Sequence, residues 1–344
     1  MGLLKSRQLG LIQNARSPRP FNYAWYAFAD TNFVSYCNAV YSGKSLGANS
    51  DAFNAAGDYL MTKRDNLGAI CYMVENFERR HLPQMESGLK GFVAFKYADE
   101  DTFRRTRKIC PTISESELGR MMTNVMAGLE TPDFKTVYET MKLHYLISRV
   151  ALTKIAAIEF SLGHRKSAKQ KLLSLLEYFH DQVAILPQNE LVVAWRYYQL
   201  KSPFFKKIQR NARGLLDSIR SMSWDLAHWR NIMTVVTANS HLEIDANFPI
   251  PYFLTFDQEF ATLLQQLQLK GIIFLASGTR YIAVPDSQSL QSFSEVLEDA
   301  EHLLTSAAVA DRQQRRPAYN ALMSHFERLA QSAGQELAAL VSNN

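Results

Sequence analysis

Cysteine is scarce in this chain of 344 residues. The three cysteines are Cys37, Cys71 and Cys110, and none has a Cys-x-x-Cys spacing. An odd number of widely spaced thiols supports neither a disulfide framework nor a structural zinc site. The sequence also has no apolar run of eighteen residues, and residues 1–10 lack the apolar core of a signal peptide. We therefore expect a cytoplasmic protein with no membrane-spanning segment.

The charge of the chain is only mildly unbalanced. The formal net charge is +5, with 47% hydrophobic and 21% charged residues. This balance is typical of a globular protein with a hydrophobic core. A small positive excess favours polyanionic partners without requiring them.

The order of the predicted elements favours an α/β fold with helix in excess. The apolar run Tyr23–Phe28 predicts a strand, and two more strands, Tyr252–Phe256 and Ile272–Leu275, surround a helix predicted over Gln258–Leu267. Short apolar strands without polar alternation argue for a parallel sheet that helices bury on both faces. Two other segments are predicted to be extended: Gly91–Phe103 and Val183–Leu186.

Four acids occupy positions that a sheet of this kind can bring together. Asp30 and Asp257 each follow a predicted strand, and ligands of open parallel sheets gather at the carboxyl ends of the strands. Glu159 lies within a predicted helix, and Asp225 lies in the first turn of a helix predicted over Ser223–Val236. If the strands are neighbours, these carboxylates converge at one edge of the sheet.

Convergent carboxylates repel one another unless cations neutralise them. Hard divalent ions that prefer oxygen ligands, Mg²⁺ or Mn²⁺, suit such a cluster. The chemistry that such a site implies is hydrolysis of phosphodiester bonds.

The sequence around these acids resembles the PIN-domain nucleases. That family opens on a strand that ends in Asp-Thr-Asn, matched here by Asp30, Thr31 and Asn32. A later acid opens a helix in the family, as Asp225 does in Asp-Leu-Ala-His, and the last acid matches Asp257 in Thr-Phe-Asp-Gln-Glu-Phe.

The second acid of the family has two candidates in this chain. Glu159 stands in an Ile-x-x-x-Glu-Phe-x-x-Gly segment, Ile155–Gly163, that is followed by a helix and the run Ala184–Pro187, and this unit matches the family as a whole. We therefore expect Glu159 to be the second acid. Glu75 remains the alternative, because its distance from Asp30 in the sequence is the more usual one for the family, whereas Glu159 lies much farther along the chain.

The resemblance implies a PIN-like parallel sheet flanked by helices. The nuclease domain would comprise residues 21–36 and 145–285, interrupted by a mostly helical insertion at 37–144. A segment at 1–20 would precede it and a helical extension at 286–344 would follow it. Glu159 and the three aspartates would be the catalytic, metal-holding residues. Thr31, Asn32 and Thr255 would orient the ligands from a second layer.

The partners that the resemblance implies are a nucleic acid and a regulatory protein. We expect RNA rather than DNA, because many small members are ribonucleases of toxin–antitoxin pairs. A toxin or an antiviral phage-defence effector would have an antitoxin or a sensor as its partner, with the insertion as the docking surface, and a homo-oligomer is a further option. The basic residues expected to hold a phosphate backbone are Arg165, Lys166, Lys169, Lys206, Lys207 and Arg210.

A non-catalytic alternative stays open. Asp30 and Asp257 can cap the helices that follow them, and an acid such as Asp225 is favoured in the first turn of a helix. In that case the protein keeps the fold and binds a protein or nucleic-acid partner without cleaving it.

Overall fold

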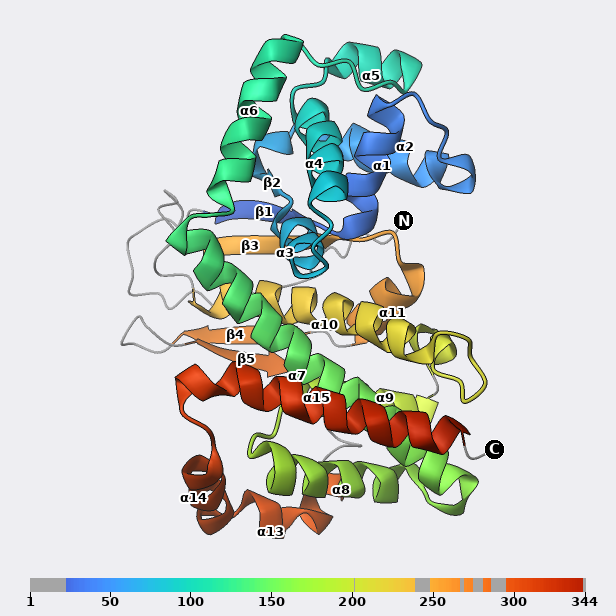
Figure 1. The fold of residues 1–344 in the computed structure, drawn as a ribbon, viewed down its shortest axis with the longest axis vertical. Helices are drawn as coiled ribbons and strands as arrows, with labels where there is room; N and C mark the ends of the chain where they lie inside the picture. Colours follow the sequence, from blue (N-terminus) through green and yellow to red (C-terminus); the bar gives the residue numbers. More distant parts are fainter. Residues whose placement is uncertain are drawn as a thin grey trace. The chain divides into compact units, whose positions relative to one another are not determined.

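The computed structural model describes residues 23–200, 202–238, 248–266, 269–274, 281–285 and 295–342. Helices dominate these residues, and short strands form two sheets (Figure 1). The strands are β1 (Tyr23–Ala29), β2 (Leu67–Gly68), β3 (Phe248–Leu254), β4 (Leu269–Phe274) and β5 (Tyr281–Pro285). The helices up to residue 128 are α1 (Thr31–Tyr41), α2 (Ser50–Leu60), α3 (Ile70–Glu78), α4 (Leu82–Lys96), α5 (Glu100–Thr106) and α6 (Glu115–Gly128). The later helices are α7 (Pro132–Leu162), α8 (Ala168–Tyr178), α9 (Gln188–Leu200), α10 (Leu215–Ala238), α11 (Gln258–Gln266), α13 (Glu301–Leu304), α14 (Ser306–Arg315) and α15 (Tyr319–Ser342).

Contacts within the chain divide it into two compact units. The first unit consists of Met1–Met141, Asn231–Ala261 and Phe274–Ile282. The second consists of Lys142–Arg230, Thr262–Ile273 and Ala283–Asn344. Each unit is described separately below.

A three-stranded parallel sheet organises the first unit. The strand order is β2-β1-β3, and β1 pairs in parallel with both neighbours. Ala27 lies opposite Leu67 on one side and Tyr252 on the other. The predicted α/β class with a parallel sheet is confirmed at this level, and so is the strand at Tyr23–Phe28. The carboxyl ends of all three strands therefore meet at one edge.

Helices α1 and α3 contact β1, and α4 packs against α1 and α3 (Figure 1). A buried aromatic cluster joins them to α2 and α5, with Phe33 and Phe95 in edge-to-face contact and Phe53 and Phe103 against them. Aromatic side chains contribute the largest apolar area to a core of this kind.

The strand expected at Gly91–Phe103 is wrong. This segment lies in α4 and α5. Phe92 and Phe95 are buried at helical spacing, and Gly91 permits the close approach of α4 to α1, because a Cβ added there would lie 2.3 Å from the Cα atom of Asn38. Ala94 is buried as well as Phe92 and Phe95, because α4 is enclosed on more than one side. The apolar residues of this segment therefore do not follow a helical period, and their alternation suggested a strand.

The strand expected at Val183–Leu186 is also wrong. Helix α8 runs on into a π-helical turn, Phe179–Val183, with both terminal side chains buried. Ala184 ends that turn in the left-handed conformation, with φ of 56°. Val183 and Ala184 are therefore buried at the end of a helix, and the half-buried Ile185 and Leu186 follow it without pairing in a sheet.

Two other boundaries differ from the prediction. Helix α10 begins at Leu215, so that Asp225 lies in the middle of the helix and not in its first turn. Strand β3 begins at Phe248 and ends at Leu254, earlier than predicted. The strand predicted at residues 272–275 overlaps β4, but residue 275 and the predicted segment 1–20 lie outside the described residues.

The second unit is helical for most of its described residues. Salt bridges connect the long helices α7 and α15, with Lys142 Nζ 3.0 Å from Glu327 Oε1 and Lys154 Nζ 2.7 Å from Glu336 Oε1. The described part of the predicted C-terminal extension, residues 295–342, is helical and ends in α15. None of the described helices combines the length and the hydropathy needed to cross a bilayer.

Candidate active site at the edge of the parallel sheet

Asp30 is a buried carboxylate at the end of β1. Its side chain caps α1 by accepting a hydrogen bond of 2.8 Å from the Phe33 amide, and only 5% of the residue is exposed. Burial raises the pKa of Asp30 to about 6. Hydrogen bonds from the Phe33 amide, the Thr255 side chain and the Phe256 backbone lower this pKa, and the negative charge of Glu75 raises it.

Glu75 is the second buried carboxylate at this edge. It lies on α3, one turn after the buried Cys71, and is 6% exposed. Thr31 Oγ1 donates a hydrogen bond of 2.5 Å to Glu75 Oε2, and Arg79, one turn later, forms an ion pair of 2.5 Å with Oε1. Burial raises the pKa of Glu75, while the Arg79 charge and the Thr31 hydroxyl lower it. The two acids are close enough for the charge of Glu75 to raise the pKa of Asp30.

Asp257 lies between β3 and α11, and is half-buried. Its Oδ1 accepts a hydrogen bond of 2.9 Å from the Phe260 amide, so it caps α11. The Asp257 amide donates to Thr255 Oγ1 at 3.1 Å. Because the Thr255 side chain also bonds to Asp30, Thr255 connects the ends of β1 and β3.

The backbone explains why these residues meet. The Asp30 amide donates to the Leu254 carbonyl at 3.0 Å, which extends the pairing of β1 and β3 past the end of the strand. Helix α3 begins two residues after β2, so Glu75 returns to the same edge. Parallel pairing therefore brings residues that are far apart in the sequence to one place.

The predicted acids divide between the two units. Asp30, Glu75 and Asp257 belong to the first unit. Glu159 and Asp225 belong to the second, where Lys171 Nζ lies 2.6 Å from Glu159 Oε2. Glu75, the alternative second acid, is thus the one that the structure brings beside Asp30.

Two of the three residues expected to orient the ligands contact the acids, and the third does not. Thr31 bonds to Glu75 and Thr255 to Asp30, whereas Asn32 is exposed in the first turn of α1. Arg79 was not expected at the site. The spacing Glu-x-x-x-Arg on a predicted helix is the signal that could have identified it, because residues four apart share a helix face.

The arrangement supplies oxygen atoms and unbalanced negative charge. Arg79 pairs with Glu75, no cation among the described residues shifts the pKa of Asp30, and burial keeps the Cys71 thiol nearby protonated by raising its pKa. Within the part of the chain that the structure describes, no three His, Cys, Asp or Glu side chains form a group that could hold a metal ion. The edge can therefore take up a proton or a cation by means of two carboxylates.

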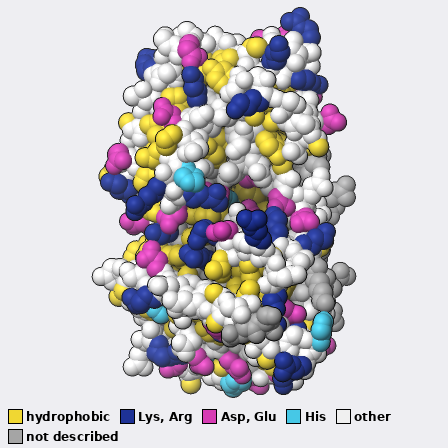
Figure 2. All heavy atoms as spheres, turned by 45° about the vertical axis from the view of Figure 1, so that its right-hand side comes forward, with side chains coloured by type: hydrophobic (Ala, Val, Ile, Leu, Met, Phe, Trp, Pro, Cys, Tyr) yellow, Lys and Arg dark blue, Asp and Glu magenta, His cyan; other side chains and the backbone are white. Residues whose placement is uncertain are grey.

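The predicted nucleic-acid-binding residues all lie in the second unit. Lys166, Lys206 and Arg210 line one pocket, and Lys169 forms an ion pair of 2.8 Å with Asp299. Arg165 and Lys207 end two short 3₁₀ turns. On the face drawn in Figure 2, Lys and Arg side chains are interspersed with Asp and Glu.

No family model matches the sequence, and no curated protein and no solved structure is significantly similar to it.

Proposed function

We propose that the protein is a metal-dependent endonuclease with a PIN-like domain, that Asp30 and Glu75 hold a Mg²⁺ or Mn²⁺ ion, and that its substrate is RNA. The observation that carries this proposal is the pair of buried carboxylates at the carboxyl edge of a parallel sheet. Ligands of such sheets gather at this edge.

The donor set supports a magnesium-like ion. Mg²⁺ in proteins is typically held by one or two carboxylates, with water and substrate phosphates completing its octahedron. Asp30 and Glu75 are two such carboxylates, and Thr31 orients the second. A bound cation offsets the repulsion that a buried pair of like charges creates.

The bound ion would supply charge stabilisation and activation of water for phosphodiester hydrolysis. In this role Asp30 and Glu75 hold the ion, and Arg79 keeps the Glu75 carboxylate in place. Asp257 lies at the neighbouring strand end, where its carboxylate acts on the water or on the substrate. Thr255 fixes its position relative to Asp30.

The PIN-like assignment rests on the order of elements around Asp30 and Asp257. Each follows a strand of the same parallel sheet and precedes a helix, as the family resemblance implies. In the proposed site Glu75 takes the place of the second acid, because it is the buried neighbour of Asp30. Glu159 then has a structural role in the second unit.

A second candidate function is that of a non-catalytic binding protein. It is favoured by the local contacts of the acids, since Asp30 and Asp257 each cap a helix and Arg79 neutralises Glu75. Under this alternative the edge contributes only to folding. The two functions differ in whether the chain cleaves RNA.

A cleavage assay tests the proposal. Labelled RNA and DNA are incubated with the wild type in Mg²⁺, Mn²⁺ or EDTA, beside Asp30→Asn. Asp99→Asn is a matched control, because Asp99 caps α5 through the Thr102 amide at 2.7 Å but is not buried. We expect RNA cleavage in either metal by the wild type and the control, and none in EDTA or by Asp30→Asn. A wild type that cleaves nothing in Mn²⁺, or an active Asp30→Asn, would contradict the proposal.

A further inference from the structure

The second unit contains a pocket that the proposed function does not use. Its volume is about 610 Å³, within the range of roughly 300–1,000 Å³ typical of small-molecule sites. The pocket is formed by the end of α7, the start of α8, the end of α9 and the turns that follow it. The residues that line it are Glu159, Phe160, Gly163, His164, Lys166, Ala168, Lys171, Tyr197, Tyr198, Ser202, Phe205, Lys206, Ile208, Gln209 and Arg210.

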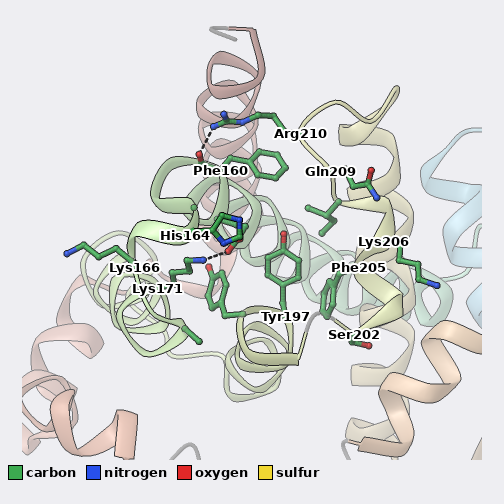
Figure 3. Close-up of a pocket in the computed structure, with 15 residues that line it drawn as sticks. Phe160, His164, Lys166, Lys171, Tyr197, Ser202, Phe205, Lys206, Gln209 and Arg210 are labelled. Atoms are coloured by element: carbon green, nitrogen blue, oxygen red, sulfur yellow. Dashed lines mark hydrogen bonds and ion pairs between the residues drawn. The ribbon is translucent and has the colours of Figure 1, made fainter.

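Aromatic side chains form part of its wall. Tyr197 and Phe205 are buried and pack edge to face, with ring centroids 4.8 Å apart. In Figure 3 the Tyr197 hydroxyl and the His164 ring lie toward the middle of the pocket, and Phe160 lies at its upper side. Such rings can stack against a flat aromatic ligand.

Cationic side chains outnumber the acid in this pocket. Glu159 is the one carboxylate among the lining residues, and Lys171 pairs with it at 2.6 Å. Lys166, Lys206 and Arg210 add three positive charges around it. Lys166 extends outward in Figure 3, where its flexible stem can bring its ammonium group to a bound anion.

Contacts with neighbouring residues hold Arg210 and Lys171 in place without using all of their N–H donors. Arg210 Nη2 donates to the Phe160 carbonyl at 2.5 Å, and its guanidinium lies 5.7 Å from the centroid of the Phe160 ring. An arginine has five N–H donors and a lysine three, more than these contacts use. Arg210 and Lys171 therefore keep N–H donors that these contacts leave unused.

A buried hydroxyl provides a separate indication of a ligand. Ser202 Oγ has no hydrogen-bond partner among the described residues, although Ser202 is only 3% exposed and lines the pocket. Buried polar groups in native proteins are nearly always paired, with protein atoms, water or a ligand.

We infer that this pocket binds a nucleotide, with the base against the aromatic wall and the phosphate bound by Arg210, Lys166 and Lys171. Two sources share this chemistry: a free mononucleotide and the phosphorylated end of an RNA strand. The inference goes beyond the proposed function, because it needs neither a metal ion nor the edge of the parallel sheet.

Calorimetric titration of the full chain in EDTA tests it. The probes are AMP, UMP, adenosine, inorganic phosphate and short oligoribonucleotides with or without a 5′ phosphate. We expect the mononucleotides to bind more tightly than adenosine and inorganic phosphate. Tighter binding of the mononucleotide than of the phosphorylated strand supports the free nucleotide as the source, and the reverse order supports the strand end.

Matched variants distinguish binding in the pocket from a general effect of positive charge. Arg210→Gln should weaken AMP binding about 10-fold and Lys166→Gln about threefold. Arg220→Gln removes the same charge as Arg210→Gln at a residue that is paired with Asp217 outside the pocket, and it should leave binding unchanged. Ala168→Phe places a ring at the pocket wall and should abolish binding, with the fold checked by circular dichroism.

Three results would overturn the inference. The first is a wild type that binds no mononucleotide at millimolar concentration. The second is adenosine or inorganic phosphate binding as tightly as AMP. The third is an equal loss of affinity in Arg210→Gln and Arg220→Gln. None of them depends on cleavage, so a failure here and a failure of the nuclease proposal are distinguishable.

Discussion

Asp30 in the first unit is compensated differently from Glu159 and Glu190 in the second unit, whereas its neighbour Glu75 is paired with Arg79. In the second unit, Glu159 is paired with Lys171, and Glu190 is paired with Arg230 and accepts a hydrogen bond of 2.8 Å from Ser148. In the first unit, the contacts that lower the pKa of Asp30 come from neutral amides and a hydroxyl, and burial outweighs them. A buried acid without compensation costs stability, so such positions are concentrated at functional sites.

A comparison of two helix caps within the first unit also shows that the burial of Asp30 is unusual. Asp30 and Asp99 both cap a helix by accepting a hydrogen bond from the amide three residues later. Burial raises the pKa of Asp30 to about 6, whereas hydrogen bonds from Thr102 lower the pKa of Asp99, which is only partly buried. Capping alone therefore does not require the burial that Asp30 shows.

Paired substitutions in the two units give the largest expected difference. Glu75→Gln should reduce RNA cleavage to the background, because it removes a carboxylate from the proposed ion site. Glu159→Gln should cleave at the wild-type rate when assayed below its melting temperature. Loss of cleavage by a folded Glu159→Gln, with Glu75→Gln active, would return Glu159 to the role of second acid.

Glu159→Gln should lower the stability of the protein. Glu159→Gln leaves Lys171 buried without a counter-charge, and breaking a buried pair costs about 3–5 kcal/mol of unfolding free energy. The carboxylate is 20% exposed, so we expect a value near the lower limit. Glu336→Gln breaks a more exposed pair with Lys154 in the same unit, and should cost at most about 1 kcal/mol. Urea denaturation measures both, and equal losses would show that burial of the pair is unimportant.

Asp30→Asn should stabilise the protein in a pH-dependent manner. The folded-state pKa of about 6 lies above the ordinary value of about 4, so ionisation of Asp30 opposes folding. The stability of the wild type should fall as the pH rises from about 4 through 6, by up to about 3 kcal/mol. Asparagine keeps the cap without the charge.

Urea denaturation in EDTA measures this effect. The gain of Asp30→Asn should be complete at pH 8 and absent at pH 4. Asp99→Asn should show the opposite sign, with a loss of stability at pH 8, because the pKa of Asp99 is lowered in the folded state. A pH-independent difference between Asp30→Asn and the wild type would show that Asp30 titrates normally.

The smallest effect is expected at Thr31. Thr31→Val removes the hydroxyl that donates to Glu75, and loss of such an orienting group typically lowers metal affinity about 10-fold or more. Thr106→Val is the control, because its hydroxyl donates to the carbonyl of Thr102 in its own helix. Mn²⁺ titration followed by electron paramagnetic resonance compares the two variants. Equal affinities would exclude Thr31 from the site.

Local pattern predicted part of the site well. The apolar run before Asp30 and the segment around Asp257 predicted their positions after the strands of a parallel sheet, because a strand that is buried on both faces needs a continuous apolar sequence. The choice between Glu75 and Glu159 could not be made in this way. Both lie on amphipathic helices, and only the pairing of the two-residue strand β2 with β1 brings Glu75 to the edge.

The errors in the fold have a common physical origin. Phe92, Ala94 and Phe95 are buried on several sides of α4, which removes the polar residues that would reveal a helical period, and Val183 and Ala184 are buried at the end of a π-helical turn. The start of α10 was missed because Gly214, with φ of 73°, precedes a first turn that carries no clear capping pattern. Tertiary packing decides such segments.

Calorimetric titration with Mn²⁺ tests most directly whether Asp30 and Glu75 hold a divalent cation. The wild type and Asp99→Asn should show the same saturable binding, and Asp30→Asn and Glu75→Gln should each lose it while retaining the circular dichroism of the folded chain. A wild type that binds no Mn²⁺, or four proteins that bind it equally, would contradict the account.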